Sequence, residues 1–324
     1  MEFRLDDGQV ELQQTVARFC DDRFPLDAVV AREGLPTDRG RWAGMAGLGV
    51  FGLLDDGPDG SGLGVLEGAI LFEQLGSHLV PGPVLWTVLA TSMVEGAARG
   101  EVLVGGVTAD AVVDGSALVE HAGDLDVLLV LHDDRVTAHH DLGEVVALDP
   151  LDPLTPVGRV SGLGGGTQVG GAGVAAATRL LGTVLSAATL AGLASRALDV
   201  AASYALEREQ FGAPIGSFQA VKHLLADMHV RSGLAQSATY AAAAMAQDPG
   251  SDDPVPAARA AKLLAADAAV ANAGTAVQVL GGMGFTWDML PNHLLKRAWV
   301  VDQSFGTADD HALRLGADLV AASR

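Results

Sequence analysis

Long stretches in which Ala and Leu recur at helical spacing fill the chain beyond Thr178. This periodicity predicts helices at about 178–207, 217–247, 257–280, 288–303 and 307–322, with a clear loop at Asp248–Pro256. Helices of this length joined by short connections bury their apolar faces against one another as an antiparallel bundle. The C-terminal half of the chain is therefore predicted to be a helical bundle.

The first half of the chain is predicted to contain helices followed by strands. Helical patterns run from a cap at Asp6 or Asp7 to Phe24, over Arg41–Leu48, and over Val65–Leu75, where Gly76 is expected to end the helix. Short Val and Leu runs separated by turn residues then predict strands. They are Val102–Val107, Ala117–Glu120, Val127–Leu131, Val136–Ala138 and Glu144–Leu148.

The fold class expected is mostly α with a middle β domain. Pro81 and Pro83 mark a boundary, so we expect an N-terminal helical domain at 1–84, a β domain at 85–163 and a helical bundle at 164–324. The glycine-rich string Gly162–Gly173 resembles a phosphate loop, but no Lys-Ser or Lys-Thr pair follows it and no strand feeds it in a βαβ unit. We interpret it as a flexible connector.

The charge and the cysteine content limit which classes of binding partner and which cellular compartment are expected for this protein. With 40 acidic and 20 basic side chains the net charge is −20, which repels nucleic acid and anionic membranes. Cys20 is the only cysteine, so no intrachain disulfide is possible and a reducing, cytoplasmic location is expected. The N-terminal residues are not expected to act as a signal peptide, and no uninterrupted 20-residue apolar run occurs in the sequence. The apolar composition favours an oligomer.

A polar corner interrupts the helical pattern between Ala205 and Met228. Gly212, Pro214 and Gly216 force a turn there, which leaves Arg208, Phe211 and Gln219 at a helix-loop-helix corner. A guanidinium, an aromatic ring and an amide suit a planar, phosphate-bearing ligand. The alternative is a solvated arginine or a surface ion pair with a neighbour such as Glu207.

A second polar interruption, Gln278–Gly284, ends a predicted helix. Its glycines are consistent with a simple helix C-cap. Alternatively, Gly281 and Gly282 allow a ligand to approach the backbone closely while Gln278 hydrogen-bonds to it. Together with the polar corner, this segment would form one side of a dinucleotide site.

These motifs resemble the acyl-CoA dehydrogenases, flavoenzymes that introduce a 2,3-double bond into acyl thioesters. The resemblance runs the length of the chain. It rests on WAGMAGLGVFGLL and LEGAILFEQLGSHLVPGP in the N-terminal part, and on RALDVAASYALEREQFGAPIGSFQAVKHLLADM and AVQVLGGMGFTWDMLPNHLLKRAW in the C-terminal part. It implies a helical domain, a β domain and a four-helix bundle in that order.

The resemblance also implies a shared FAD site. In the family, the corner and the QVLGG segment of one subunit reach the dinucleotide of its neighbour. The matching residues here, together with Thr307 of the last motif, are the expected cofactor contacts: Arg208, Phe211, Gln219, Gln278, Gly282 and Thr307.

The expected catalytic base is missing. The family places a Glu either in a YEGT-type string, which here has Phe305 at that position, or just before an Arg on the first bundle helix, where Thr178 precedes Arg179. Neither side chain can remove an α-proton. Asp302, Asp309 and Asp310 are alternatives for a displaced base, although solvated helix-end positions are the simpler interpretation. The flavin-ring motifs of the β domain have no recognisable counterpart, and that domain is shortened.

The chain therefore resembles the small, non-catalytic subunit of actinobacterial heteromeric acyl-CoA dehydrogenases that act on steroid side-chain thioesters. This implies a catalytic partner subunit, a heterotetramer and FAD shared between subunits. Two alternatives stay open: a self-sufficient homo-oligomer with Asp302 or Asp309 as base, and a flavin-free scaffold.

The remaining polar groups suggest no further site. His139, His140 and Glu144 are expected to be exposed rather than metal ligands. His223 and Asp227, one helical turn apart, are expected to form a structural pair, and His311 has no obvious partner.

Overall fold

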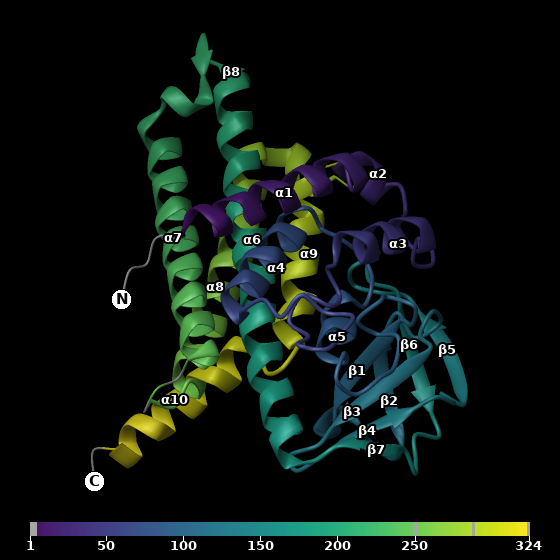
Figure 1. The fold of residues 1–324 in the computed structure, drawn as a ribbon. Coiled ribbons are helices and arrows are strands. Elements are labelled where there is room, and N and C mark those ends of the chain that lie inside the picture. Colours follow the sequence, from purple (N-terminus) through teal and green to yellow (C-terminus); the bar gives the residue numbers. More distant parts are fainter. Residues whose placement is uncertain (1–4, 249, 251, 287–288, 323–324) are drawn as a thin grey trace. The chain divides into compact units, whose positions relative to one another are not determined.

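The computed structural model describes residues 5–248, 250, 252–286 and 289–322 (Figure 1). The chain folds as two compact units, each assembled from distant segments. Unit 1 comprises Met1–Leu26, Ala69–Val80 and Thr183–Arg324, and unit 2 comprises Asp27–Gly68 and Pro81–Gly182. The predicted fold class, mostly α with a β region in the middle, is confirmed. The division into three domains stays a prediction.

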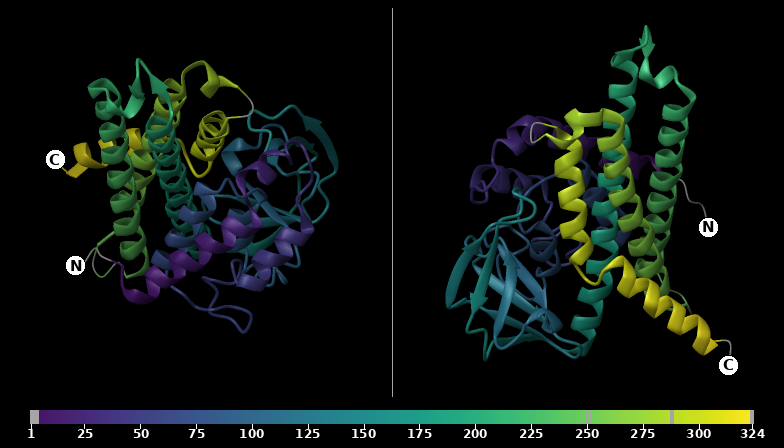
Figure 2. Two further views of the ribbon diagram at one scale, coloured as in Figure 1. Left: turned by 90° about the horizontal axis from the view of Figure 1, so that it is seen from above. Right: turned by 180° about the vertical axis from the view of Figure 1, so that it is seen from behind.

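Unit 1 is a helical bundle (Figures 1 and 2). Its long helices are α1 (Asp7–Arg23), α6 (Ala172–Glu207, from Thr183 onward in this unit), α7 (Gln219–Gln247), α8 (Val255–Leu280), α9 (Leu290–Gln303) and α10 (Ala308–Ala322). Helix α8 packs against α7, α9 and α10. The predicted long helices are confirmed, but α6 begins at Ala172, six residues before its expected start.

Most of the buried residues of α8 are alanines. The side-chain amide of one further buried residue, Asn272, links α8 to two other helices of the bundle. Asn272 of α8 is fully buried. Its Nδ2 lies within hydrogen-bond distance of three acceptors, which share its two hydrogens: the carbonyl of Ala194 on α6 at 3.1 Å, the carbonyl of Met228 on α7 at 3.0 Å and Ser232 Oγ at 2.9 Å. A buried amide costs little only when its hydrogen bonds are satisfied, so this residue fixes the register of α8 against α6 and α7.

Helix α4 (Val65–Ser77) contacts α6 backbone to backbone in unit 1. A Cβ on Gly76 would lie 2.2 Å from the carbonyl oxygen of Thr189, and one on Gly192 would lie 1.9 Å from that of Glu73. The prediction that Gly76 ends the helix is wrong, because α4 continues to Ser77. Gly76 instead provides the space in which α6 approaches.

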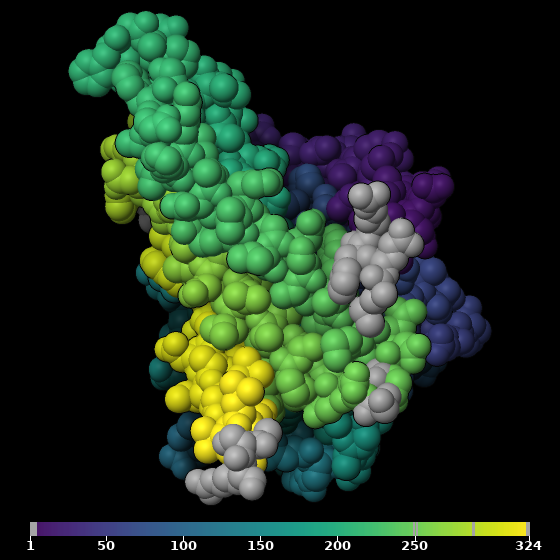
Figure 3. Space-filling model, turned by 90° about the vertical axis from the view of Figure 1, so that its left-hand side faces the viewer, coloured from purple at the N-terminus to yellow at the C-terminus, as the bar shows by residue number. Residues whose placement is uncertain are grey.

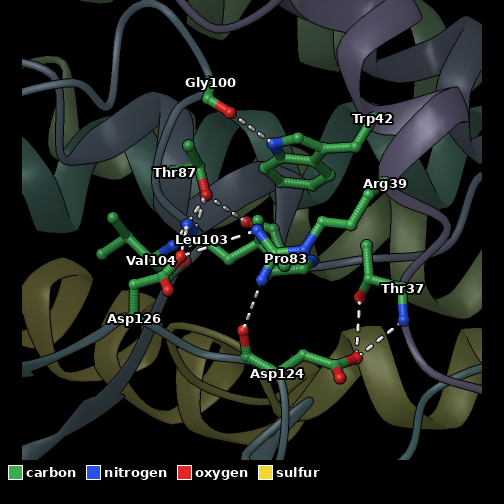
Figure 4. Close-up of polar contacts among 10 residues, drawn as sticks. All are labelled: Thr37, Arg39, Trp42, Pro83, Thr87, Gly100, Leu103, Val104, Asp124 and Asp126. Carbon is green, nitrogen blue, oxygen red and sulfur yellow. Dashed lines mark hydrogen bonds and ion pairs between the residues drawn. The ribbon is translucent and has the colours of Figure 1, made fainter.

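Unit 2 contains short helices that are tied to the β region by polar contacts (Figure 4). They are α2 (Leu26–Val30, largely in this unit), α3 (Arg39–Leu48) and α5 (Val84–Leu89). Helix α3 ends at Leu48, as predicted, and Gly49, whose φ is 85°, caps it. Just before α3, the backbone and hydroxyl of Thr37 donate to Asp124 at 2.7 and 3.0 Å, and Trp42 Nε1 donates to the carbonyl of Gly100 at 2.9 Å.

The strands of the described residues form two larger sheets in unit 2. The first has the order β1 (Val104–Thr108), β3 (Val127–Leu131), β4 (Val136–His139) and β7 (Thr167–Gly170), with β1 and β3 parallel. The second has the order β2 (Ser116–Glu120), β6 (Val157–Ser161) and β5 (Glu144–Leu148). An apolar core that includes Leu128, Val130 and Val160 draws side chains from both sheets.

The β region corrects several predictions. Helices α2 and α5 and strands β6 and β7 were not expected, and β1 pairs in parallel with β3. The glycine-rich string Gly162–Gly173 is not merely a connector, since it contains β7, which pairs with β4, and the start of α6.

By length and composition, α6 and the segment Val255–Phe285 could each cross a membrane. Within the structure, 61% and 56% of their apolar windows are buried, as in the core helices of a bundle.

Candidate functional site

The polar corner folds as a tight hairpin between α6 and α7. Strand β8 (Glu209–Gln210) pairs with β9 (Ala213–Pro214), and Phe211 and Gly212 form the tip with φ of 54° and 80°. Positive φ at both tip residues is typical of a two-residue hairpin turn of type I′. Such a backbone is strained for a phenylalanine, yet its ring is 96% exposed and gains no core contacts in return.

The side chains of the corner point away from the chain's own core. Phe211 touches Phe218 edge to face, with the ring centroids 6.2 Å apart. The backbone of Arg208 is fixed because its carbonyl accepts from Ile215 N at 2.7 Å. Its exposed guanidinium makes no hydrogen bond or ion pair with any residue that the structure describes, so the predicted alternative of a pair with Glu207 is not seen. Gln219, the first residue of α7, is also exposed.

The second predicted segment follows α8. Gly281, with φ of 65°, caps that helix, and residues Gly281–Phe285 form a 3₁₀ turn, η3. The C-cap interpretation is thus correct for Gly281. Gln278 on the last turn of α8 is exposed, and a Cβ on Gly282 would meet nothing within 4 Å, so this backbone is open to a ligand.

Both segments lie at the same end of the bundle (Figures 1 and 2). The hydroxyl of Tyr204, on the last turn of α6, is 4.0 Å from Met283 Sδ in η3. In Figure 3 the hairpin corner stands clear of the helices below it. The structure therefore gathers five of the six predicted cofactor contacts at one exposed end of the bundle: Arg208, Phe211, Gln219, Gln278 and Gly282.

Thr307 lies elsewhere in the bundle. It precedes α10, and its backbone N–H and its hydroxyl both donate to Asp310 Oδ2, at 3.0 and 2.8 Å. Ser304, three residues before Thr307, accepts a hydrogen bond from Lys262 of α8. Lys262 lies sixteen residues before Gln278 on the same helix. At 1.5 Å per residue, this separates Thr307 from Gln278 by about 24 Å along α8. Thr307 is not brought together with the other five residues.

The three aspartates considered as displaced bases lie around the start of α10. Asp302 Oδ1 accepts from Ala308 N at 3.0 Å, and Asp309 is exposed in the first turn. Hydrogen bonds from Thr307, its backbone N–H first, hold the pKa of Asp310 below its usual value. Carboxylates in these positions satisfy the free N–H groups and the dipole of a helix.

The two positions where the family carries a glutamate are both buried. Phe305 is 7% exposed, with φ of 60°, and Thr178 on α6 is 4% exposed. Neither can act as a base, so no described residue at the expected positions can remove the α-proton.

Sequence reasoning missed a buried lysine beside Phe305. Lys262 is fully buried, and its Nζ donates to the carbonyls of Val301 at 2.8 Å and Ser304 at 2.9 Å. It thereby caps the C-terminal end of α9, where a positive charge is favourable. Burial, together with the charge of Lys262, lowers the pKa of His311 to about 4, so this histidine is neutral at pH 7.

A second missed network surrounds Glu73, which is 4% exposed in α4. Its carboxylate accepts from Tyr240 Oη at 2.5 Å and from Gln236 Nε2 at 2.7 Å, both on α7. Burial raises the pKa of Glu73 above its usual value, and the two hydrogen bonds only partly offset this. An Ala-rich or Leu-rich helical pattern gives no sign of such a partnership, because the partners lie on distant elements.

The other histidines form no metal site. Among the residues that the structure describes, no group of three or more His, Cys, Asp or Glu side chains is arranged to hold a metal ion. His223 and Asp227 are exposed on α7, and no hydrogen bond or ion pair joins them within the described chain.

Family models match both halves of the chain. The acyl-CoA dehydrogenase N-terminal domain matches residues 6–98, and the acyl-CoA dehydrogenase C-terminal domain matches residues 170–319. Acyl-CoA dehydrogenase IpdE2 of Mycolicibacterium smegmatis is 31% identical, and the match covers 95% of this chain and 97% of IpdE2. Acyl-CoA dehydrogenase FadE34 of Mycobacterium tuberculosis is 35% identical over 79% of this chain, which spans only 39% of FadE34.

A solved complex has the same fold. The ChsE4-ChsE5 complex of Mycobacterium tuberculosis aligns with a TM-score of 0.83 and 25% identity, and the alignment covers 99% of both chains.

Proposed function

Since the chain belongs to the acyl-CoA dehydrogenase family, we propose that it is a non-catalytic subunit that completes the FAD site of a catalytic partner. The family consists of FAD-dependent oxidoreductases, and the reaction proposed for the complex is α,β-dehydrogenation of an acyl-CoA thioester. A steroid side chain is the proposed acyl group, and a heterotetramer the proposed assembly. The observation that carries the proposal is the contrast between the exposed positions of the predicted cofactor contacts and the absence of a glutamate at positions 305 and 178, where Phe305 and Thr178 stand.

The exposed end of the bundle fits a dinucleotide. Arg208 offers an exposed guanidinium that has no partner among the described residues, a group suited to charge-assisted hydrogen bonds with phosphate oxygens. Phe211 offers a ring face, Gln219 and Gln278 offer amides, and the backbone at Gly282 is open. FAD supplies the two-electron acceptor for the oxidation. The part proposed for this chain is to hold the adenosine diphosphate portion of the partner's FAD and so to fix where its other end lies.

The proton is proposed to leave through the partner's base. A positioned general base typically contributes about 10²- to 10⁴-fold to the rate. Phe305 and Thr178 supply no such base, so slow α-proton removal is expected of this chain alone even when FAD is present.

A partner subunit also explains why the corner is so exposed. Within the described chain the ring of Phe211 contacts only the edge of Phe218 and stays almost fully exposed, whereas a bound neighbour would bury it and offset the strained backbone. The solved relative ChsE4-ChsE5 is a complex of two named proteins, which supports the same kind of assembly here.

Co-expression tests the proposal. The chain purified alone should be nearly colourless and inactive, and co-purification with a catalytic dehydrogenase subunit should give a yellow complex that oxidises an acyl-CoA. A yellow homo-oligomer that turns over unaided would contradict the proposal and favour a displaced base, which substitution of Asp302 and Asp309 would then test. A complex whose FAD content does not depend on Arg208 would identify the chain as a flavin-free scaffold.

A further inference from the structure

Unit 2 contains a cavity of about 410 Å³ that the proposed function does not use. Its polar lining comprises His132, Arg135, Thr137, His139 and the glycines Gly164–Gly166. The glycines belong to the string that resembles a phosphate loop in the sequence. The pairing of β4 with its neighbouring strands and the close approach of Gly166 bring these lining residues together.

Strand register directs two of the polar side chains toward the core of the unit. Thr137 of β4 pairs with Val130, and His139 pairs with Leu128. Directly opposed residues in a sheet share a face, and both Leu128 and Val130 belong to the apolar core between the sheets. The cavity therefore extends from the core, and polar groups on β4 form one wall of it.

A threonine hydroxyl links the two imidazoles. Thr137 Oγ1 is 3.3 Å from His132 Nε2 and 3.3 Å from His139 Nε2. The hydroxyl has one proton to donate, so it can donate to one ring while accepting from the other. Burial first, and then the proximity of His132, lower the pKa of His139 below its usual value.

The glycine-rich segment Gly164–Gly166 contacts His139, one of these two histidines. A Cβ on Gly166 would lie 2.4 Å from His139 Nε2, so any larger residue would displace the imidazole from its position. Gly165 has φ of 65°, a backbone turn of the kind that exposes successive amide groups on one side. Gly164 and Gly165 are exposed, which leaves their backbone accessible at the rim of the cavity.

The charged lining is basic. Arg135 is the only charged residue among the described residues that line the cavity, and none of them is a carboxylate. Asp134 accepts from Arg135 Nη1 at 2.9 Å, which leaves the other guanidinium nitrogens of Arg135 available. Guanidinium, imidazole, hydroxyl and backbone N–H groups are the donors that bind phosphate oxygens in proteins.

We propose that this cavity binds a phosphoryl group, either as inorganic phosphate or on a larger molecule such as a nucleotide. The volume exceeds that of one phosphate and leaves room for an attached group. The site lies wholly within unit 2, whereas the FAD contacts proposed above lie in unit 1, so either proposal can fail without the other.

Calorimetric titration of the full-length protein with inorganic phosphate, AMP and acetate tests the proposal. Saturable binding of phosphate or AMP is expected, and their relative affinities tell free phosphate from a carried phosphoryl group. Arg135→Gln should weaken binding about 10-fold or more, because it removes a charge-assisted contact. The matched control is Arg159→Gln, which removes one charge from the exposed face of β6 in the same unit and should leave binding unchanged.

His139→Asn is a second variant, which should also weaken binding while circular dichroism reports whether unit 2 remains folded. The proposal is overturned if neither phosphate nor AMP binds saturably. It is also overturned if acetate binds as tightly as phosphate, or if Arg135→Gln and Arg159→Gln weaken binding equally.

Discussion

The backbone contact between α4 and α6 predicts that Gly192→Ala destabilises unit 1. The new Cβ would lie 1.9 Å from the carbonyl oxygen of Glu73, which is 1.1 Å inside the 3.0 Å that real Cβ atoms keep. The neighbouring atom belongs to the backbone of a helix, so it cannot swing aside as a flexible side chain would. Overpacking of this kind costs about 1 to 3 kcal/mol and sometimes more.

One favourable term opposes this cost. Replacing Gly by Ala inside a helix gains about 1 kcal/mol of helix propensity. A clash this close should cost about 3 kcal/mol, the upper end of the overpacking range. Subtracting the gain of about 1 kcal/mol, we expect the free energy of unfolding to fall by about 2 kcal/mol. The matched control is Gly233→Ala on α7, where a Cβ would meet nothing within 4 Å and only the gain applies.

Urea denaturation followed by circular dichroism measures both variants against the parent chain. Gly192→Ala should move the midpoint to lower urea, and Gly233→Ala should leave it unchanged or move it higher. If Gly192→Ala proves as stable as Gly233→Ala, then α4 and α6 do not touch at this position, and our account of Gly76 and Gly192 fails.

Two further predictions concern Glu73 and Phe211. Because burial raises the pKa of Glu73, the native state holds its proton more tightly than the unfolded chain does. Stability is therefore lost as pH rises from 4.5 through the folded pKa. Glu73→Gln should cost less stability at pH 7 than at pH 4 in denaturation curves, and an equal cost would refute the burial argument. Phe211→Gly relieves a strained φ and removes no core contact, so stability should change by less than about 1 kcal/mol. FAD retention by the complex should nevertheless fall, and normal retention would show that the ring has no part in binding.

Helical periodicity was enough to predict the bundle, because each long helix carries its own repeating apolar face. It failed where the deciding partner is remote in sequence. Gly76 has the local appearance of a helix stop, and only the carbonyl of Thr189 explains why it lies inside α4. Strands β6 and β7 are short and rich in polar residues or glycine, and it is pairing with β2, β5 and β4 that holds them.

The site divides in the same way. The exposed corner that contains Arg208, Phe211 and Gln219 could be predicted, because polar and aromatic residues between two apolar helices stand out in the sequence, while their part in FAD binding stays a prediction. Lys262 and Glu73 could not, because one lies on an alanine-rich helix, the other on a leucine-rich one, and both depend on partners from other elements. The sequence likewise predicted a turn around Phe211 but not the two short strands, β8 and β9, that pair on either side of it.

FAD affinity of the co-purified complex tests the central claim most directly. Arg208→Ala removes the one guanidinium of the corner, and loss of a charge-assisted contact of about 1.5 to 3 kcal/mol should weaken FAD binding about 10- to 150-fold. The control is Arg314→Ala, which removes an exposed arginine of α10 and should leave FAD bound. If the Arg208→Ala complex assembles and retains FAD as tightly as the Arg314→Ala complex, then Arg208 does not contact the partner's FAD and the central claim is wrong.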